Sequence, residues 1–282
     1  MQLSFDAVDA RHPAARAGAA AALRALSLEV AAGEQVAVIG PSGAGKTTLL
    51  HVAAVALPPQ RGHVCLAGVD PWAAGARERR RMRTRLFLAP QVPPLPPRQR
   101  VVTSVLAGRL PAMSLAASLR SLFYPMHIDL AHEALARFDL SEKLFERVDR
   151  LSGGERQRVG LARALVSPAS LWLIDEPLSA LDPTRAQQAI ATLTQLARER
   201  GHTLVATLHD VPMALANFAR IVALRDGALA FDLPAAQVTP AHLQQLYAQE
   251  SGAAASRAAP PVAAPPEAPV AEPARPVLPY CR

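Results

Sequence analysis

The stretch GPSGAGKT, residues 40–47, decides the fold of this chain of 282 residues. A glycine, four further residues and then Gly-Lys-Thr form the pattern of a phosphate-binding loop. The apolar run QVAVIG (35–40) leads into it as a predicted strand, and KTTLLHVAAVAL (46–57) follows it as a predicted helix. This order of strand, loop and helix predicts a phosphate site in an α/β fold and argues against a glycine-rich turn without a ligand.

The residue types of the loop explain how it would hold a phosphate. Glycines let the backbone pass close to the ligand, so that N–H groups point at phosphate oxygens, and the helix start adds the positive end of its dipole. We expect Lys46 to contact the β- and γ-phosphates and the Thr47 hydroxyl to bind Mg²⁺. The predicted ATP contacts of this segment are Gly40, Pro41, Ser42, Gly43, Ala44, Gly45, Lys46, Thr47 and Thr48.

A second motif, LWLIDEP (171–177), ends an apolar run with two acids. A short apolar run is typical of a strand buried on both faces, and open α/β sheets bind ligands at the carboxyl ends of such strands. Asp175 is the candidate for Mg²⁺, directly or through water, and Glu176 is the candidate general base that polarises the attacking water. The structural alternative for this motif alone is a solvated acidic turn.

A third motif, LSGGERQR (151–158), begins with a serine and two glycines. Ser152 with Glu155 three residues later predicts a capping box at a helix start. Two glycines are costly in a first helical turn unless something approaches the backbone closely. A second anion site at this helix start is the functional interpretation.

Strands and helices alternate along the chain, which predicts a mostly parallel sheet covered by helices. Together with 35–40, the expected strands are 26–30, 63–68, 85–89, 171–175, 202–208, 221–224 and 228–232. The expected further helices are 128–148, 184–199 and one near 211–218.

The three motifs, together with SALD (179–182) and TLHD (207–210), resemble the ATP-binding subunits of ABC transporters. The resemblance covers roughly residues 1–250. It implies an α/β P-loop NTPase of the ABC type, with a mostly parallel core, an antiparallel β subdomain and an inserted helical subdomain at about 92–165.

The resemblance also implies how the site works. Two subunits would face head to tail and sandwich two ATP molecules with Mg²⁺, each site combining the phosphate loop of one subunit with Ser152, Gly153 and Gly154 of the other. Asp182 would lie across the same interface. His209 matches the switch histidine that contacts the γ-phosphate and braces Glu176.

Gln91 matches the glutamine of the loop that joins the core to the helical subdomain and contacts the permease, and it is expected near Mg²⁺ and the attacking water. It stands in LAPQVPPLPPRQR (88–100), whose prolines fix φ and predict that any loop movement is hinged at the loop's ends. Pro90 departs from the aromatic residue that the family often has before this glutamine. His12 stands where the family usually stacks an aromatic ring on adenine, and it is the candidate for that role.

Composition limits the remaining possibilities. A net charge of +7 suits phosphate-bearing ligands or an anionic membrane face, and only two lysines, Lys46 and Lys143, occur among 30 basic residues. Cys65 and Cys281 form no disulfide framework, so we expect a reducing cytoplasm. The apolar runs are too short for a membrane helix, and no signal peptide pattern is present. The proline- and alanine-rich end, 251–282, is predicted to be a disordered tail, with a docking segment that ends in Cys281 as the alternative.

The arginine run RERRRMRTR (77–85) is interpreted as a solvated helix face, with contact to anionic lipid or to acidic permease loops as the alternative. The segments 103–125 and 206–232 resemble phosphonate-import ATPases. The resemblance therefore implies an ATPase that energises import of phosphonate or a related phosphorus oxyanion.

An amino-acid or metal importer, a lipoprotein-release exporter, and a soluble ABC ATPase of nucleic acid or the ribosome remain alternatives. The expected partners are membrane permease subunits, a second ATP-binding subunit and, indirectly, a solute-binding protein, with no nucleic acid. The expected place is the cytoplasmic face of the inner membrane.

Overall fold

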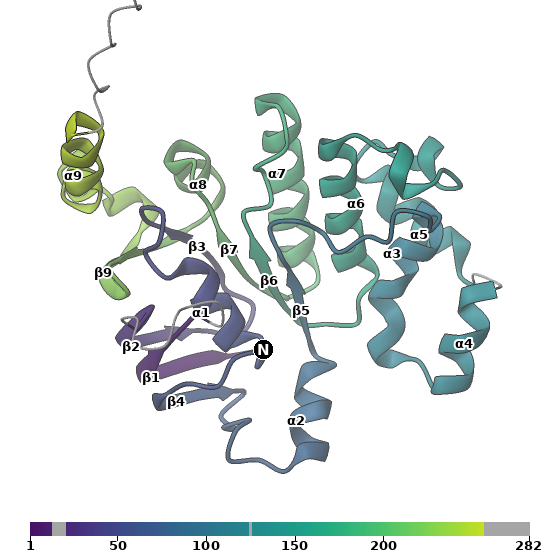
Figure 1. The fold of residues 1–282 in the computed structure, drawn as a ribbon, viewed down its shortest axis with the longest axis horizontal. Helices are drawn as coiled ribbons and strands as arrows, with labels where there is room; N and C mark the ends of the chain where they lie inside the picture. The colour runs from purple at the N-terminus through teal and green to yellow at the C-terminus, as the bar shows by residue number, and fades with distance from the viewer. Residues whose placement is uncertain (13–20, 124–125, 257–282) are drawn as a thin grey trace, which may run out of the picture. The chain divides into compact units, whose positions relative to one another are not determined.

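A six-stranded sheet carries the loop at 40–47 in the computed structural model, which describes residues 1–12, 21–123 and 126–256. In sheet order its strands are β5 (Leu86–Ala89), β6 (Leu171–Asp175), β7 (Thr203–Thr207), β3 (Gln35–Ile39), β8 (Arg220–Arg225) and β9 (Ala228–Pro234) (Figure 1). The first five strands run parallel and β9 pairs antiparallel with β8. The carboxyl ends of β3, β5, β6 and β7 therefore meet at one edge of the sheet, which is where ligands of such sheets bind.

A second, antiparallel sheet consists of β1 (Leu3–Ala10), β2 (Leu23–Val30) and β4 (Arg61–Leu66) in the order β2-β1-β4. This sheet confirms the expected antiparallel β subdomain. β2 begins at Leu23, three residues before the predicted strand, because the fully buried side chains of Leu23 and Leu26 extend its inward face.

Helices cover both faces of the six-stranded sheet (Figure 1). Among the described residues the α-helices are α1 (Lys46–Ala53), α2 (Ala76–Arg83), α3 (Val101–Leu106), α4 (Leu115–Phe123), α5 (Ile128–Ala136), α6 (Gly153–Val166), α7 (Pro183–Glu199), α8 (Val211–Asn217) and α9 (Pro240–Ser256). The core beneath one face joins α3, α5, α6, α7 and α8, and the core beneath the other joins α1 to the antiparallel sheet. The parallel core covered by helices agrees with the sequence prediction.

The strand β6 shows how the sequence specifies this layering. Trp172 and Ile174 point into the core shared with α6 and α7, whereas Leu171 and Leu173 point into the core shared with α1. All four side chains are fully buried. Successive side chains of a strand alternate between faces, so an uninterrupted apolar run fits a strand that is covered on both sides.

The segment between β5 and α6 differs from the sequence prediction. The prediction of a single helix over 128–148 is wrong, because α5 ends at Ala136 and Asp139 takes a left-handed φ of 52°. Arg158 of α6 donates a 2.6 Å hydrogen bond to the carbonyl of Phe138, which the end of α5 leaves without a helical partner. Two short 3₁₀ helices, Ser141–Lys143 and Val148–Arg150, follow instead.

The contacts divide the chain into one unit, Met1–Tyr247, which holds every candidate site residue, and a second, Ala248–Arg282. Residues 251–256 of the predicted tail belong to α9, and 257–282, with Cys281, lie outside the described residues. Within the described part of the chain, no helix has the length and apolar character that crossing a bilayer requires.

Candidate functional site

The loop between β3 and α1 has a backbone that only glycine permits. Gly40, Gly43 and Gly45 have φ angles of 149°, 79° and 102°. A Cβ on Gly40 would lie 2.2 Å from the carbonyl oxygen of Leu224, and one on Gly45 would lie 2.4 Å from that of Ala22. Neighbouring backbone thus leaves no space for a side chain at either position, so both must be glycine.

Lys46, the first residue of α1, is 5% exposed, and its ammonium group lies inside the loop. Its Nζ donates to the carbonyl oxygens of Gly40 at 2.7 Å and Pro41 at 3.1 Å. A buried ammonium requires such acceptors. The loop therefore holds a positive charge in place at the helix start.

A cavity of 460 Å³ opens in front of this loop, within the usual size of small-molecule sites. It gathers the loop with side chains from three other segments. Its lining residues are His12, Ala22, Ser42, Gly43, Ala44, Gly45, Lys46, Thr47, Thr48, Gln91, Glu176 and His209. The structure thus brings together nearly all candidates that the sequence assigned to one nucleotide, except that Gly40, Pro41 and Asp175 lie outside the lining.

Glu176 stands at the centre of a polar cluster on the far side of this cavity. The Gln91 amide donates from Nε2 to Glu176 Oε2 at 2.6 Å, and the His209 Nε2 contacts Glu176 Oε1. The Glu176 side chain is 14% exposed, whereas that of His209 is 49% exposed. Three different loops, after β5, β6 and β7, therefore meet on one carboxylate.

The backbone of Glu176 has a left-handed φ of 44°, which is uncommon for a residue with a side chain. Its N–H donates to the Thr207 hydroxyl at 2.9 Å, and that hydroxyl donates to Asp175 Oδ1 at 2.6 Å. Asp175 and Thr207 are paired across β6 and β7. Thr207 thus fixes the position of both acids.

Sequence reasoning missed Thr207, although it lies in the TLHD motif, because only the β6–β7 register places it beside Asp175. It also missed Gln157, which is 4% exposed on α6 and whose Nε2 lies 3.5 Å from the carbonyl oxygen of Glu176. No pattern in the sequence marks Gln157 except its place within LSGGERQR.

The proline-rich loop after β5 packs directly on α6. A Cβ on Gly160 would lie 2.6 Å from Cγ of Pro93, so the ring fills the space that this glycine leaves. The Arg163 guanidinium donates to the carbonyl oxygen of Pro94 at 3.4 Å. The loop that carries Gln91 is therefore seated against the helix that begins at the LSGG motif.

That helix start forms a second cavity, of 820 Å³, lined by Ser152, Gly154 and Asp182 among others. The predicted capping box is present: Ser152 Oγ accepts from the Glu155 N–H at 3.2 Å, and Glu155 Oε2 accepts from the Ser152 N–H at 2.7 Å. The Ser152 N–H bond is the main cause that lowers the pKa of the Glu155 carboxyl below its ordinary value. Among the described residues, no atom beyond the adjoining residues and the helix backbone lies within 4 Å of a Cβ on Gly153, so its backbone is open to approach.

Asp182 also serves a local role, because its Oδ1 caps α7 by accepting from the Arg185 N–H at 3.0 Å. Neither Asp182 nor Ser152 lines the cavity at the phosphate loop. Within one chain, the structure therefore separates the two groups of predicted site residues.

His12 lines the 460 Å³ cavity in front of the phosphate loop, and its ring centroid lies 6.4 Å from that of His51 on α1. The two rings are tilted by 32°. His51 carried no sequence prediction. The position at the cavity edge suits an aromatic contact with a flat ligand group.

Comparison with known proteins gives concordant results. The family model "ABC transporter" matches residues 23–179. A "Phosphonates import ATP-binding protein PhnC" of Polaromonas sp. is 73% identical over 249 residues, which cover 88% of this chain and 90% of the relative. A "Phosphonates import ATP-binding protein PhnC 2" of Pseudomonas aeruginosa is 50% identical over 281 residues, covering 100% of both chains.

Solved structures of ATP-binding cassettes are also similar to this chain. A dimeric ATP-binding cassette in a post-hydrolysis state, bound to ADP and Pi, is 25% identical with a TM-score of 0.69, and the match covers 83% of this chain and 98% of that one. A bacterial Atm1-family ABC exporter with ATP bound is 27% identical with a TM-score of 0.69, over 90% of this chain and 42% of that one.

Proposed function

The chain belongs to the ABC transporter family as one of its ATP-binding ATPase subunits, and from this premise we propose that it energises the import of phosphonate or a related phosphorus oxyanion. The observation that carries the ATPase assignment is the single cavity in which the phosphate loop faces Gln91, Glu176 and His209. The solute class is supported by the Polaromonas and Pseudomonas relatives, whose names both refer to phosphonate import.

We propose that the phosphate loop binds the ATP phosphates through its backbone N–H groups and through Lys46. Lys46 now donates to two carbonyl oxygens of the loop, and phosphate oxygens would take over these bonds. Glu176 accepts a proton from the attacking water as the general base. Gln91 and His209 hold this carboxylate from two sides, which fixes its direction towards the cavity.

The donor set also fits Mg²⁺, which prefers oxygen ligands and keeps several waters beside substrate phosphates. The Thr47 hydroxyl lines the cavity, and buried Asp175 lies directly before Glu176. Gln91 uses its amide nitrogen on Glu176, and its carbonyl oxygen accepts no hydrogen bond within residues 1–12, 21–123 and 126–256. Thr47, Gln91 and Asp175 would hold the ion, which supplies charge neutralisation at the phosphates.

We propose that a second subunit completes each site. Ser152, Gly153, Gly154 and Asp182 contact ATP bound to the phosphate loop of the partner. The separation of the two cavities within one chain supports this arrangement, as does the dimeric state named for a similar cassette. The open helix start at Gly153 offers N–H groups to an anion.

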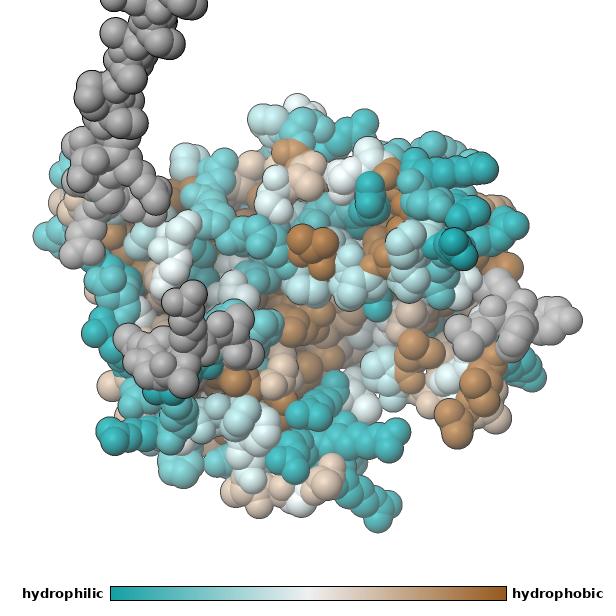
Figure 2. Space-filling model, in the orientation of Figure 1, coloured by the Kyte–Doolittle hydropathy of each residue, from teal (hydrophilic) through white to brown (hydrophobic). Residues whose placement is uncertain are grey.

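The permease is the proposed membrane partner, and it would place the chain at the cytoplasmic face of the inner membrane. Figure 2 shows apolar side chains gathered around β5 and the loop that follows it. In this loop Val92 is 79% exposed and Leu95 is partly buried against the core, as is Phe87 of β5. An exposed apolar residue next to Gln91 fits a contact that senses the nucleotide state.

The solute never touches this subunit, so the test of the solute class lies in its transport partner. We expect the solute-binding protein encoded beside this gene to bind a phosphonate such as methylphosphonate in a calorimetric titration. Binding of an amino acid, with no heat from phosphonate, would refute the proposed solute class and leave the ATPase assignment intact.

A further inference from the structure

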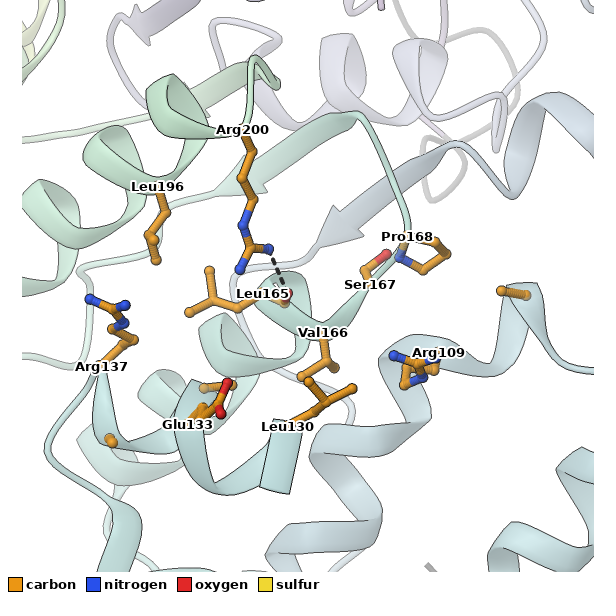
Figure 3. A pocket seen from close by; sticks show the side chains of 13 residues that line it. Arg109, Leu130, Glu133, Arg137, Leu165, Val166, Ser167, Pro168, Leu196 and Arg200 are labelled. Carbon is orange, nitrogen blue, oxygen red and sulfur yellow. Dashed lines mark hydrogen bonds between the residues drawn. The ribbon is translucent and has the colours of Figure 1, made fainter. Parts of the chain in front are cut away.

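A cavity of 490 Å³ lies between the helical segment and the catalytic core, apart from both cavities described above. Its walls come from α5, the turn after α3, the end of α6 with the loop that follows it, and the end of α7 (Figure 3). The lining residues are Arg109, Ala112, Leu130, Glu133, Ala134, Ala136, Arg137, Leu165, Val166, Ser167, Pro168, Leu196 and Arg200. None of them belongs to the predicted ATP site.

Three guanidinium groups line this cavity, from Arg109, Arg137 and Arg200, and Glu133 supplies its one carboxylate. None of the three arginines forms an ion pair among the described residues, and Glu133 does not either. The wall therefore carries an uncompensated double positive charge. A cavity wall with this net positive charge favours an anionic ligand.

The arginines of this cavity also have N–H groups that donate no hydrogen bond to another described residue. The Arg109 Nε is buried and has no hydrogen-bond partner in the described part of the chain. Arg200 uses one Nη to donate to the carbonyl oxygen of Leu165 at 2.7 Å, which fixes its guanidinium beside the cavity (Figure 3). Arg200 uses one of its N–H groups in this way, and the N–H groups that a guanidinium presents to the cavity are donors that an oxyanion accepts strongly.

The rest of the wall is apolar. Leu130, Val166 and Leu196 project towards the cavity in Figure 3, between the guanidinium groups. A free inorganic anion would leave these side chains in contact with water. A ligand with an apolar substituent would cover them and gain about 25 cal/mol for each Å² of apolar surface buried.

We propose that this cavity binds a small organic phosphate or phosphonate with an apolar substituent, the oxyanion on the arginines and the substituent on the leucine and valine wall. A phosphate monoester carries a charge of about −1.5 to −2 at pH 7, which matches the wall better than a single carboxylate does. Arginine is also suited to such oxyanions by its forked donors. The proposal does not depend on which solute is transported.

The test is a calorimetric titration of the full chain with phenylphosphonate at pH 8, with Mg²⁺ and excess ADP present to occupy the phosphate loop. We expect saturable binding, and about tenfold or greater weakening in Arg137→Gln, because charged hydrogen bonds contribute on that scale. The Arg137 side chain forms no hydrogen bond or ion pair within residues 1–12, 21–123 and 126–256, and Arg109→Gln gives a second, independent arm. Arg198→Gln, an exposed neighbour on α7, is the matched control and should bind as the wild type does.

Titrations with inorganic phosphate and with benzyl alcohol test the oxyanion and the apolar substituent of the ligand separately. Phenylphosphonate should bind more tightly than either one. Absence of saturable heat with the phosphate loop occupied would overturn the proposal, and so would affinity that is unchanged in both Arg137→Gln and Arg109→Gln.

Discussion

Gln91 Nε2 donates a 2.6 Å hydrogen bond to Glu176 Oε2, and this bond joins the loop after β5 to the end of β6. The same loop is seated on α6 through Pro93 and Gly160. A displacement of the loop by a partner would therefore act directly on the candidate general base. The bond offers a short route between the proposed permease contact and the proposed general base.

Replacement of Lys46 tests the phosphate loop. We expect Lys46→Ala to lower ATP affinity or turnover by about tenfold or more, because an ammonium bound to phosphate makes charged hydrogen bonds. Lys143→Ala is the matched control, since Lys143 is the other lysine of the chain and lies outside the cavity. Equilibrium binding of a fluorescent ATP analogue and release of phosphate are the measurements. Equal behaviour of the two variants would contradict the assignment.

A mixing experiment tests whether each site is shared between two subunits. Lys46→Ala and Ser152→Tyr are each expected to be inactive alone. In a head-to-tail pair of these two variants, one site keeps both its lysine and its serine, so ATPase activity should return in the mixture. A chain with both substitutions, mixed with wild type, leaves no intact site in the mixed pair and serves as the control. If the complementary mixture stays as inactive as its components, the shared site is wrong.

Gly160 tests the seat of the proline-rich loop. An alanine inside a helix is normally favoured over glycine by about 1 kcal/mol. At Gly160 the added Cβ would lie 2.6 Å from Pro93, and such overpacking typically costs about 1–3 kcal/mol. We expect Gly160→Ala to lower the free energy of unfolding in urea and to reduce ATPase activity by shifting Gln91. Gly75→Ala, at the N-cap of α2 where no described atom lies within 4 Å of the Cβ, should leave ATPase activity unchanged and should lower the free energy of unfolding by less than Gly160→Ala does. A more stable Gly160→Ala protein would refute the packing argument.

The capping box predicts a pH dependence of stability. Folding lowers the pKa of Glu155, so its contribution is present above the unfolded pKa of about 4.3 and is lost as the pH falls through the folded value. At pH 7 we expect Glu155→Gln to lower the free energy of unfolding by about 0.5–1 kcal/mol. Urea denaturation should show the free energies of unfolding of the two proteins converging as the pH falls through the folded pKa of Glu155. A difference that stays constant with pH would contradict the role of the carboxylate.

Much of the fold could be predicted because the order of apolar and polar residues indicates which strands and helices are buried. The run LWLID is apolar on both alternating faces, and β6 is covered on both sides. The prediction of one helix over 128–148 was wrong although the spacing of its apolar residues is helical. Leu140, Leu144 and Val148 are buried at helical spacing, yet the left-handed backbone of Asp139 ends the helix, and periodicity does not reveal a single φ angle.

The candidate site was predictable where a motif places residues at the end of a strand. The phosphate loop, Gln91, Glu176 and His209 line one cavity, as expected from the carboxyl ends of parallel strands. Thr207 and Gln157 were missed because their contacts depend on strand register and on the seat of α6. The arginine-lined cavity was also beyond reach, since its three arginines lie far apart in sequence.

The most direct test of the account is the turnover of Glu176→Gln, which keeps the shape of the side chain and removes its basicity. We expect phosphate release from ATP to fall by about 100-fold or more, because general bases contribute on that scale. ATP should still bind, and size-exclusion chromatography with ATP should show a dimer. Phosphate release at the wild-type rate would contradict the central claim that Glu176 is the general base of this cavity.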